Sequence, residues 1–139
     1  MSEAIADRFA VQDVMLRYAA GVDERDLDMY RSCFADDVEV HGFGEETVVG
    51  ADAWTEYVEA ALEPFGPTQH LLGLQHAEID GDQAHCRTDV QALHCLKAPE
   101  GEVFTLWATY VTDMQRVGGE WKITRHELVP RATKRETVS

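Results

Sequence analysis

The sequence has few basic residues, few cysteines and no long apolar run. Lys and Arg number 12 against 26 Asp and Glu, which gives a formal net charge of −14. A surface of this charge repels nucleic acid and anionic membrane surfaces, so we expect neither as a partner. No run approaches the roughly 18 consecutive apolar residues that a transmembrane helix requires. The three cysteines form no even set and no C-x-x-C pair, so we expect free thiols in or near the core.

The beginning of the chain, MSEAIADRFAVQDVM, holds acidic side chains and no basic segment before an apolar run. This pattern does not match a signal peptide, and we expect a cytoplasmic location. The length of 139 residues and the hydrophobic content of 45% suit one domain over residues 1–139 that buries a real core.

Apolar spacing predicts three helices in the first half of the chain. Over residues 5–22 one helical stripe carries four apolar side chains at i, i+4, i+7 and i+11, namely Val11, Met15, Tyr18 and Val22. A short helix over residues 27–34 follows Asp26, which is a good N-cap. A third helix covers roughly residues 51–63 and ends at Pro64.

Alternation predicts a hairpin over residues 38–49 and four antiparallel strands after the third helix. The strands cover residues 69–79, 83–96, 103–116 and 120–129, separated by DGD, KAPEGE and VGG turns. Period two places four residues on one face of the first of them: His70, Leu72, Leu74 and His76. This order of elements favours an α+β fold, a curved sheet wrapped over a helical layer with a cavity between the two.

Several segments in this order resemble the SnoaL-like branch of the nuclear transport factor 2-like superfamily. They are LRYAAGVDERDLDMYRSCFADDVEV, the Trp-bearing third helix, TQHLLG…AEIDGDQAHCRTDV and the terminal GGEWKI. The resemblance covers essentially the whole chain. It implies an α+β cone, with three N-terminal helices on a curved mixed or antiparallel sheet that encloses a pocket, assembled as a homodimer or homotrimer. Members include dehydratases, polyketide cyclases, ketosteroid isomerase, limonene epoxide hydrolase and non-catalytic binding domains, so fold is better determined than function.

The resemblance to scytalone dehydratase and bile acid dehydratase implies a catalytic set of Tyr18, Asp23, His70 and His94. Asp23 would orient His70 as the base, and Tyr18 and His94 would hydrogen-bond a substrate carbonyl as it gains negative charge. Each residue also has an ordinary structural role open to it: Tyr18 in the core, Asp23 at the helix end and His94 exposed near a strand end. His76 is expected near the rim, in a structural or solvated role.

Aromatic side chains are candidates for the walls of the pocket, although each is more often plain core. The expected substrate-binding residues are Phe34, His41, Trp54, Trp107 and Tyr110, with Phe43 and Phe65 as further candidates. His41 is included because the general-base Asp of ketosteroid isomerase would fall near Gly42, where this chain has no carboxylate.

Arg87 and Asp89 form an Arg-x-Asp unit like that of limonene epoxide hydrolase, with Glu127 as a possible third acid. Their parity with His85 and Gln91 favours instead a surface ion pair on the outer face of the sheet, which would suit a polar subunit contact.

The six histidines show no metal-ligand spacing, and the sequence has no phosphate-binding loop. We therefore expect a lyase, a dehydratase or cyclase, that needs no metal or cofactor. Its expected substrate is a small hydrophobic or aromatic molecule, cyclic and polyketide- or steroid-like. The alternatives are a non-catalytic small-molecule-binding module on the same fold and an epoxide hydrolase.

Overall fold

The computed structural model describes residues 2–138 and contains three helices and six strands in these residues. The helices are α1 (Glu3–Asp23), α2 (Leu27–Ser32) and α3 (Ala51–Leu62). The strands are β1 (Phe34–His41), β2 (Val48–Val49), β3 (Phe65–Asp80), β4 (Gln83–Leu96), β5 (Glu102–Val117) and β6 (Glu120–Thr137). The predicted order of helix, helix, hairpin, helix and four antiparallel strands is confirmed.

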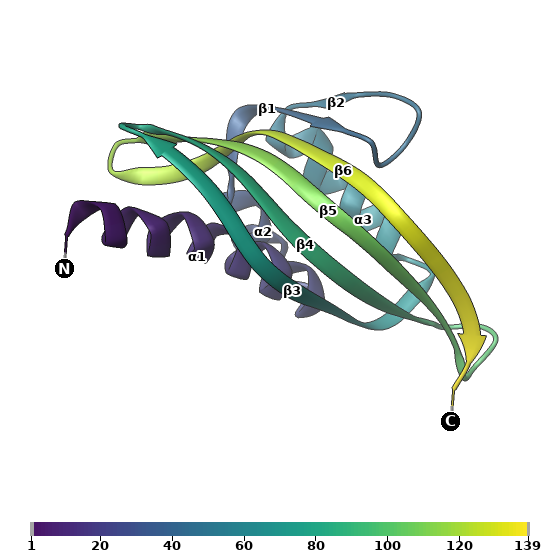
Figure 1. Ribbon diagram of the computed structural model, residues 1–139. Coiled ribbons are helices and arrows are strands. Elements are labelled where there is room, and N and C mark those ends of the chain that lie inside the picture. Colours follow the sequence, from purple (N-terminus) through teal and green to yellow (C-terminus); the bar gives the residue numbers. More distant parts are fainter. Residues whose placement is uncertain (1, 139) are drawn as a thin grey trace.

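The strands form one curved sheet in the order β2-β1-β6-β5-β4-β3. β1 runs parallel to β6, and the other neighbours are antiparallel, so the sheet is mixed. The three helices lie on one side of this sheet, and the long strands bend across them (Figure 1). This is the predicted α+β cone.

The helix α1 forms because its apolar stripe has a sheet to pack against. Val11, Met15, Tyr18 and Val22 are all buried, as the spacing predicts. The helix ends in a Schellman motif, in which Asp26 N–H donates to the Gly21 carbonyl at 2.8 Å and Arg25 N–H donates to the Val22 carbonyl at 3.2 Å. The side chain of Asp26 then caps α2 by accepting from Met29 N–H at 3.0 Å.

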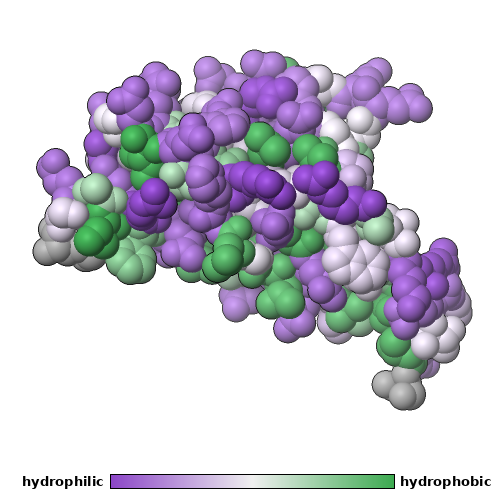
Figure 2. All heavy atoms as spheres, in the orientation of Figure 1, coloured by the Kyte–Doolittle hydropathy of each residue, from purple (hydrophilic) through white to green (hydrophobic). Residues whose placement is uncertain are grey.

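Alternation along β4 separates an inner face from an outer one. The inner face packs toward the helices and buries Ala84, Cys86, Thr88, Val90 and Ala92. The outer face exposes His85, Arg87, Asp89 and Gln91. Hydrophilic side chains cover most of the surface seen in Figure 2, with separate hydrophobic groups among them. The expected contact between subunits on the outer face stays a prediction.

The prediction that His70, Leu72, Leu74 and His76 share one face of β3 is wrong beyond Leu72. A register shift against β4 falls between Leu72 and Gln75. Leu74 lies within this shift and is 93% exposed, and His76 follows it and is also exposed. Gly73 lies at this irregularity, where a β-carbon would come within 3.2 Å of the β-carbon of Asp89. A bulge of this kind reverses the direction of the following side chains, so His70 alone of the two histidines faces inward.

None of the helices in residues 2–138 is both long enough and apolar enough to cross a membrane. The three cysteines are free thiols, and Cys33 and Cys86 are buried.

Candidate active site

An aromatic cavity of about 140 Å³ lies between the helices and the inner face of the sheet. Each of the three helices contributes to it, together with the loop after β1 and the strands β3, β4 and β5. Its lining residues are Tyr18, Val22, Tyr30, Phe43, Trp54, Tyr57, Val58, Ala61, Leu62, Phe65, His70, His94 and Tyr110. No Lys, Arg, Asp or Glu side chain belongs to this lining, so the cavity suits a neutral, mostly apolar molecule.

His70 and Asp23 meet at the wall of this cavity. Nδ1 of His70 lies 2.7 Å from Oδ1 of Asp23, and the backbone N–H of His70 donates to Oδ2 at 2.7 Å. A carboxylate only accepts, so Nδ1 carries a proton, and in the neutral form of the ring the lone pair is on Nε2. The His70 side chain is 8% exposed, and the expected pairing of these two residues is present.

Asp23 is held in its ionised form. Its partial burial would raise the pKa, but the hydrogen bonds from the side chain and backbone of His70, the charge of His70 and the Thr68 hydroxyl outweigh burial and lower the pKa below its ordinary value. The Thr68 hydroxyl donates to Oδ1 at 3.0 Å. The three donors therefore fix the carboxylate, and the carboxylate fixes the ring of His70.

His94 lies near His70 in the lining, with ring centroids 5.8 Å apart. Its Nδ1 donates to the Phe104 carbonyl at 3.3 Å. Burial lowers its pKa, and the neighbouring His70 lowers it further, which favours the neutral ring. A neutral His94 with its proton on Nδ1 offers Nε2 as a hydrogen-bond acceptor. The sequence-based expectation was that His94 would donate a hydrogen bond to a substrate carbonyl.

Tyr18 lines the cavity but its hydroxyl points to a partner in the core. It lies 2.9 Å from Nε2 of His126, which is fully buried on β6. Burial raises the pKa of Tyr18, Tyr30 and Tyr110 well above the ordinary value, so all three hydroxyls stay protonated. Sequence reasoning gave no role to His126, because a register shift between β5 and β6 breaks the alternation that begins with the buried Trp121 and Ile123.

Two of the expected wall residues line the cavity and three do not. Trp54 and Tyr110 are in the lining, and so are the further candidates Phe43 and Phe65. Phe34, His41 and Trp107 are outside it, which corrects the expectation for these three.

The three corrected residues have other neighbours. Phe34 packs against the ring of Tyr30 at a centroid distance of 5.0 Å, within the core. Trp107 pairs with Gln91 on the outer face of the sheet. Nδ1 of His41 lies 3.1 Å from the Thr47 hydroxyl in the β1–β2 hairpin.

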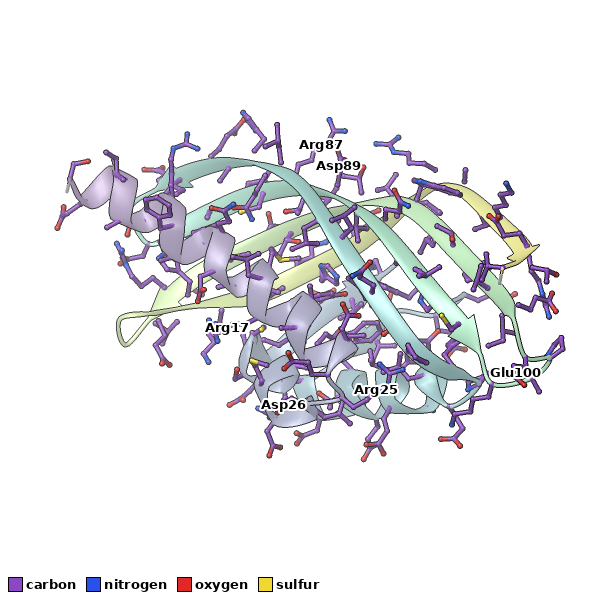
Figure 3. All side chains as sticks on the ribbon, turned by 90° about the horizontal axis from the view of Figure 1, so that it is seen from below. Arg17, Arg25, Asp26, Arg87, Asp89 and Glu100 are labelled. Atoms are coloured by element: carbon purple, nitrogen blue, oxygen red, sulfur yellow. The ribbon has the colours of Figure 1, made fainter. Side chains whose placement is uncertain are left out.

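Arg87 and Asp89 project from the outer face, away from the cavity, as their parity predicts (Figure 3). The two side chains are more than half exposed, and their closest approach is 3.5 Å. Glu127 pairs with Arg125 at 3.1 Å and is also absent from the cavity lining. The arrangement required for the epoxide hydrolase alternative, an Arg-Asp pair and a third acid around one cavity, is therefore not formed.

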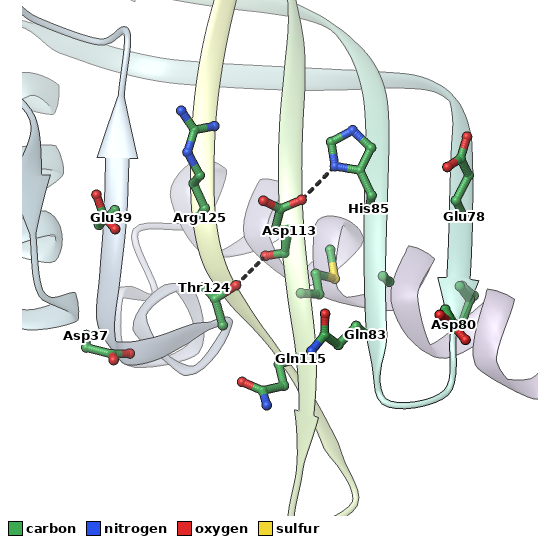
Figure 4. A pocket seen from close by; sticks show the side chains of 13 residues that line it. Asp37, Glu39, Glu78, Asp80, Gln83, His85, Asp113, Gln115, Thr124 and Arg125 are labelled. Carbon is green, nitrogen blue, oxygen red and sulfur yellow. Dashed lines mark hydrogen bonds and ion pairs between the residues drawn. The ribbon is translucent and has the colours of Figure 1, made fainter.

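A larger hollow of about 720 Å³ lies on the outer face of the sheet and holds a second His–Asp pair (Figure 4). Nδ1 of His85 lies 2.6 Å from Oδ1 of Asp113, but the His85 side chain is 59% exposed. Water screens such a pair and competes for its hydrogen bonds. The pair of His70 and Asp23 is the better candidate for catalysis, because it is shielded and borders an apolar cavity.

Residues 2–138 contain no group of three or more His, Cys, Asp or Glu side chains arranged to hold a metal ion.

Solved structures of low sequence identity share this fold, and they include the following three. A candidate scytalone dehydratase from Novosphingobium aromaticivorans is 23% identical, with a TM-score of 0.88 over 98% of this chain and 91% of that one. The hexachlorocyclohexane dehydrochlorinase LinA-type3 from Novosphingobium barchaimii is 22% identical, with a TM-score of 0.86 over 96% and 92%. A candidate aromatic ring hydroxylase from Novosphingobium aromaticivorans is 26% identical, with a TM-score of 0.85 over 95% and 94%.

No protein of curated function matches the sequence. The model of a family described as the SnoaL-like domain matches residues 3–127, which is most of the chain. The chain therefore belongs to the SnoaL-like family, within the nuclear transport factor 2-like superfamily.

Proposed function

We propose that this protein is a cofactor-independent lyase that eliminates a leaving group from a small, neutral, cyclic substrate, with His70 as the general base. The observation that carries the proposal is the placement of the His70 ring. Its Nδ1–H is held by Asp23 at 2.7 Å, and the ring lines an aromatic cavity, so that the lone pair on Nε2 is the basic group on offer.

The proposed reaction is a β-elimination. Nε2 of His70 takes a proton from a substrate carbon, and the electron pair of that C–H bond forms a C=C double bond. The bond from the neighbouring carbon to the leaving group breaks, and the leaving group departs with its electron pair. The fixed carboxylate of Asp23 stabilises the imidazolium that forms, as the third member of a catalytic triad does.

The fate of the proton depends on the leaving group. A hydroxyl group leaves as water when the His70 imidazolium returns the proton to it, so one histidine acts as base and then as acid. A halide leaves as an anion, and the imidazolium then loses its proton to solvent. The structural relatives include a candidate dehydratase and a dehydrochlorinase, which are named for these two leaving groups.

The cavity limits the part of the substrate that reacts. Its volume of about 140 Å³ is close to that of an engineered apolar cavity of about 150 Å³ in another protein that binds benzene. It encloses about one six-membered ring. A polyketide- or steroid-like substrate would insert only its reacting ring and leave the remainder outside.

Two simple probes test the proposal. β-Hydroxycyclohexanone reports loss of water by the ultraviolet absorbance of the conjugated enone, and hexachlorocyclohexane reports loss of halide by chloride release. We expect His70→Gln, which keeps a donor for Asp23 but provides no base, to lower kcat by about 10²- to 10⁴-fold. The matched control is His85→Gln, which removes the exposed member of the other His–Asp pair and should retain full activity.

A fully active His70→Gln protein would contradict the proposed base. If neither probe reacts but both quench the fluorescence of Trp54 in the cavity wall, the non-catalytic binding module is favoured instead.

A further inference from the structure

Arg25 occupies a position where the backbone favours glycine. It is the C′ residue of the Schellman motif that ends α1, and its φ is +58°. Among residues 2–138 it is the only residue other than glycine with a positive φ. A side chain at this position costs conformational energy that glycine avoids, so the Arg25 side chain must contribute interactions that offset the cost.

The guanidinium of Arg25 joins the end of α1 to the beginning of β3. Nη1 donates to the Val22 carbonyl at 2.7 Å and to the Thr68 hydroxyl at 3.0 Å, and Nη2 donates to the Gly66 carbonyl at 2.6 Å. Asp23 follows Val22 on the helix, and His70 lies two residues beyond Thr68 on the strand. The three hydrogen bonds therefore hold together the two segments that carry the His–Asp pair.

The contact with Thr68 also sets the direction of a hydrogen bond. Because a guanidinium only donates, the Thr68 oxygen accepts from Arg25, and its own proton is free to go to Oδ1 of Asp23, 3.0 Å away. Oδ1 is the same oxygen that accepts from Nδ1 of His70. The chain of contacts runs from Arg25 through Thr68 and Asp23 to the imidazole.

We propose that Arg25 and Thr68 are positioning residues for the base, which fix the Asp23 carboxylate and through it the orientation of His70. The proposal rests on the proposed function for its catalytic meaning, but the orientation of the ring can be measured without a substrate. A misplaced base loses rate even when the substrate still binds, because proton transfer requires a close and aligned donor and acceptor.

The first test measures how fast the His70 Nδ1–H exchanges with water, by proton NMR. The signal is assigned by its absence from the His70→Gln spectrum. Arg25→Met removes the guanidinium and keeps a side chain on the same backbone, and Thr68→Val removes the hydroxyl at nearly constant shape. We expect each change to accelerate the exchange of the Nδ1–H proton about tenfold. Loss of about one hydrogen bond raises the equilibrium constant for the opening of the His70–Asp23 contact by this factor.

Matched controls separate positioning from general loosening. Thr68→Ser keeps the hydroxyl and should exchange at the wild-type rate. Arg87→Met removes an arginine from the outer face, far from Arg25 (Figure 3), and should also leave the rate unchanged. In the double variant Arg25→Met with Thr68→Val, the combined acceleration should be smaller than the product of the two single effects, because part of the effect of Arg25 passes through the Thr68 hydroxyl.

The second test uses turnover of β-hydroxycyclohexanone. Arg25→Met should lower kcat about tenfold while KM changes less than about twofold, and Arg25→Lys should restore part of the loss.

Unchanged Nδ1–H exchange in folded Arg25→Met and Thr68→Val proteins would overturn the proposal, as would strictly additive effects in the double variant. If Arg25→Met does not fold, the pair Thr68→Val and Thr68→Ser decides alone. If His70→Gln remains active while Arg25→Met exchanges faster, the positioning role stands and the assignment of the base fails.

Discussion

The hydroxyl of Tyr18 lies 2.9 Å from Nε2 of His126, although 108 residues separate the two in the chain. The other ring nitrogen of His126 lies 3.2 Å from the Thr112 hydroxyl. His126 is 0% exposed, and this burial lowers its pKa to about 3. The ring is therefore neutral in the folded protein, where it ties α1 to the centre of the sheet.

The buried His126 makes stability depend on pH. The unfolded chain binds a proton on this residue below about pH 6.5, whereas the folded chain does so only below about pH 3. Stability is thus fully present above about pH 6.5 and is lost as pH falls toward 3, by about 1.4 kcal/mol per pH unit from this group. Urea unfolding measured at steps from pH 7 to pH 4 checks this slope.

The variant His126→Gln isolates the contribution of this group. Glutamine can still hydrogen-bond to Tyr18 and Thr112 but does not titrate. We expect a cost of about 1–2 kcal/mol at pH 7 and a flatter dependence at lower pH, so that the two stability curves cross between about pH 5 and pH 6 and the variant is the more stable protein at pH 4. Parallel curves for the two proteins would show that His126 does not cause the acid sensitivity.

The arrangement of the site was partly predictable from the alternation of the strands and from the resemblance to a known family. Parity on β4 correctly placed Arg87 and Asp89 outward. The pairing of Asp23 with His70 was implied by the resemblance to scytalone dehydratase, and the two side chains do meet in the structure.

The rest depends on tertiary contacts that have no local signature. The bulge after Leu72 reverses His76 because β3 and β4 lose register there, which a strict period of two cannot represent. The core position of His126 depends on a partner at Tyr18 that lies far away in the sequence. Trp107 was assigned to the cavity by its residue type, although it shares its parity with outward residues.

The thiols should differ in reactivity. Burial raises the pKa of Cys33 to about 11 and that of Cys86 to about 12, so neither forms the reactive thiolate near neutral pH. Cys95 is only partly buried. Brief treatment of the native protein with iodoacetamide should modify Cys95 alone, as read by mass spectrometry, and urea should release the other two. Rapid modification of Cys33 or Cys86 without denaturant would be inconsistent with the buried positions.

The charge of Asp23 should be essential to activity. In Asp23→Asn the new amide group can donate to Nδ1 of His70, which moves the ring proton to Nε2 and removes the base. The equivalent change in a serine protease lowers kcat by about 10⁴-fold, and we expect a loss of about 10³- to 10⁴-fold here. The measurement is kcat with whichever probe the wild-type protein converts.

A neighbouring substitution controls for the Asp23 change. Asp26→Asn alters a nearby carboxylate whose role is to cap α2, and asparagine caps as well as aspartate. It should therefore keep full activity. Equal losses in the two variants would point to damage at the end of α1 rather than to the state of the imidazole.

The cavity itself can be filled from α3 without touching the His–Asp pair. Ala60 and Ala61 are both exposed, but only Ala61 belongs to the lining of the cavity. Ala61→Phe introduces a ring into a space of about 140 Å³, so little room remains for a substrate ring. We expect kcat/KM to fall at least about 10²-fold with either probe, because the displaced substrate loses its apolar contacts and its approach to Nε2.

Ala60→Phe is the control: it places the same ring in solvent and should leave kcat/KM unchanged. The urea midpoints of both variants should stay near that of the parent, because the substituted positions are not in the packed core. Retained turnover in Ala61→Phe would show that the substrate reacts elsewhere than in this cavity.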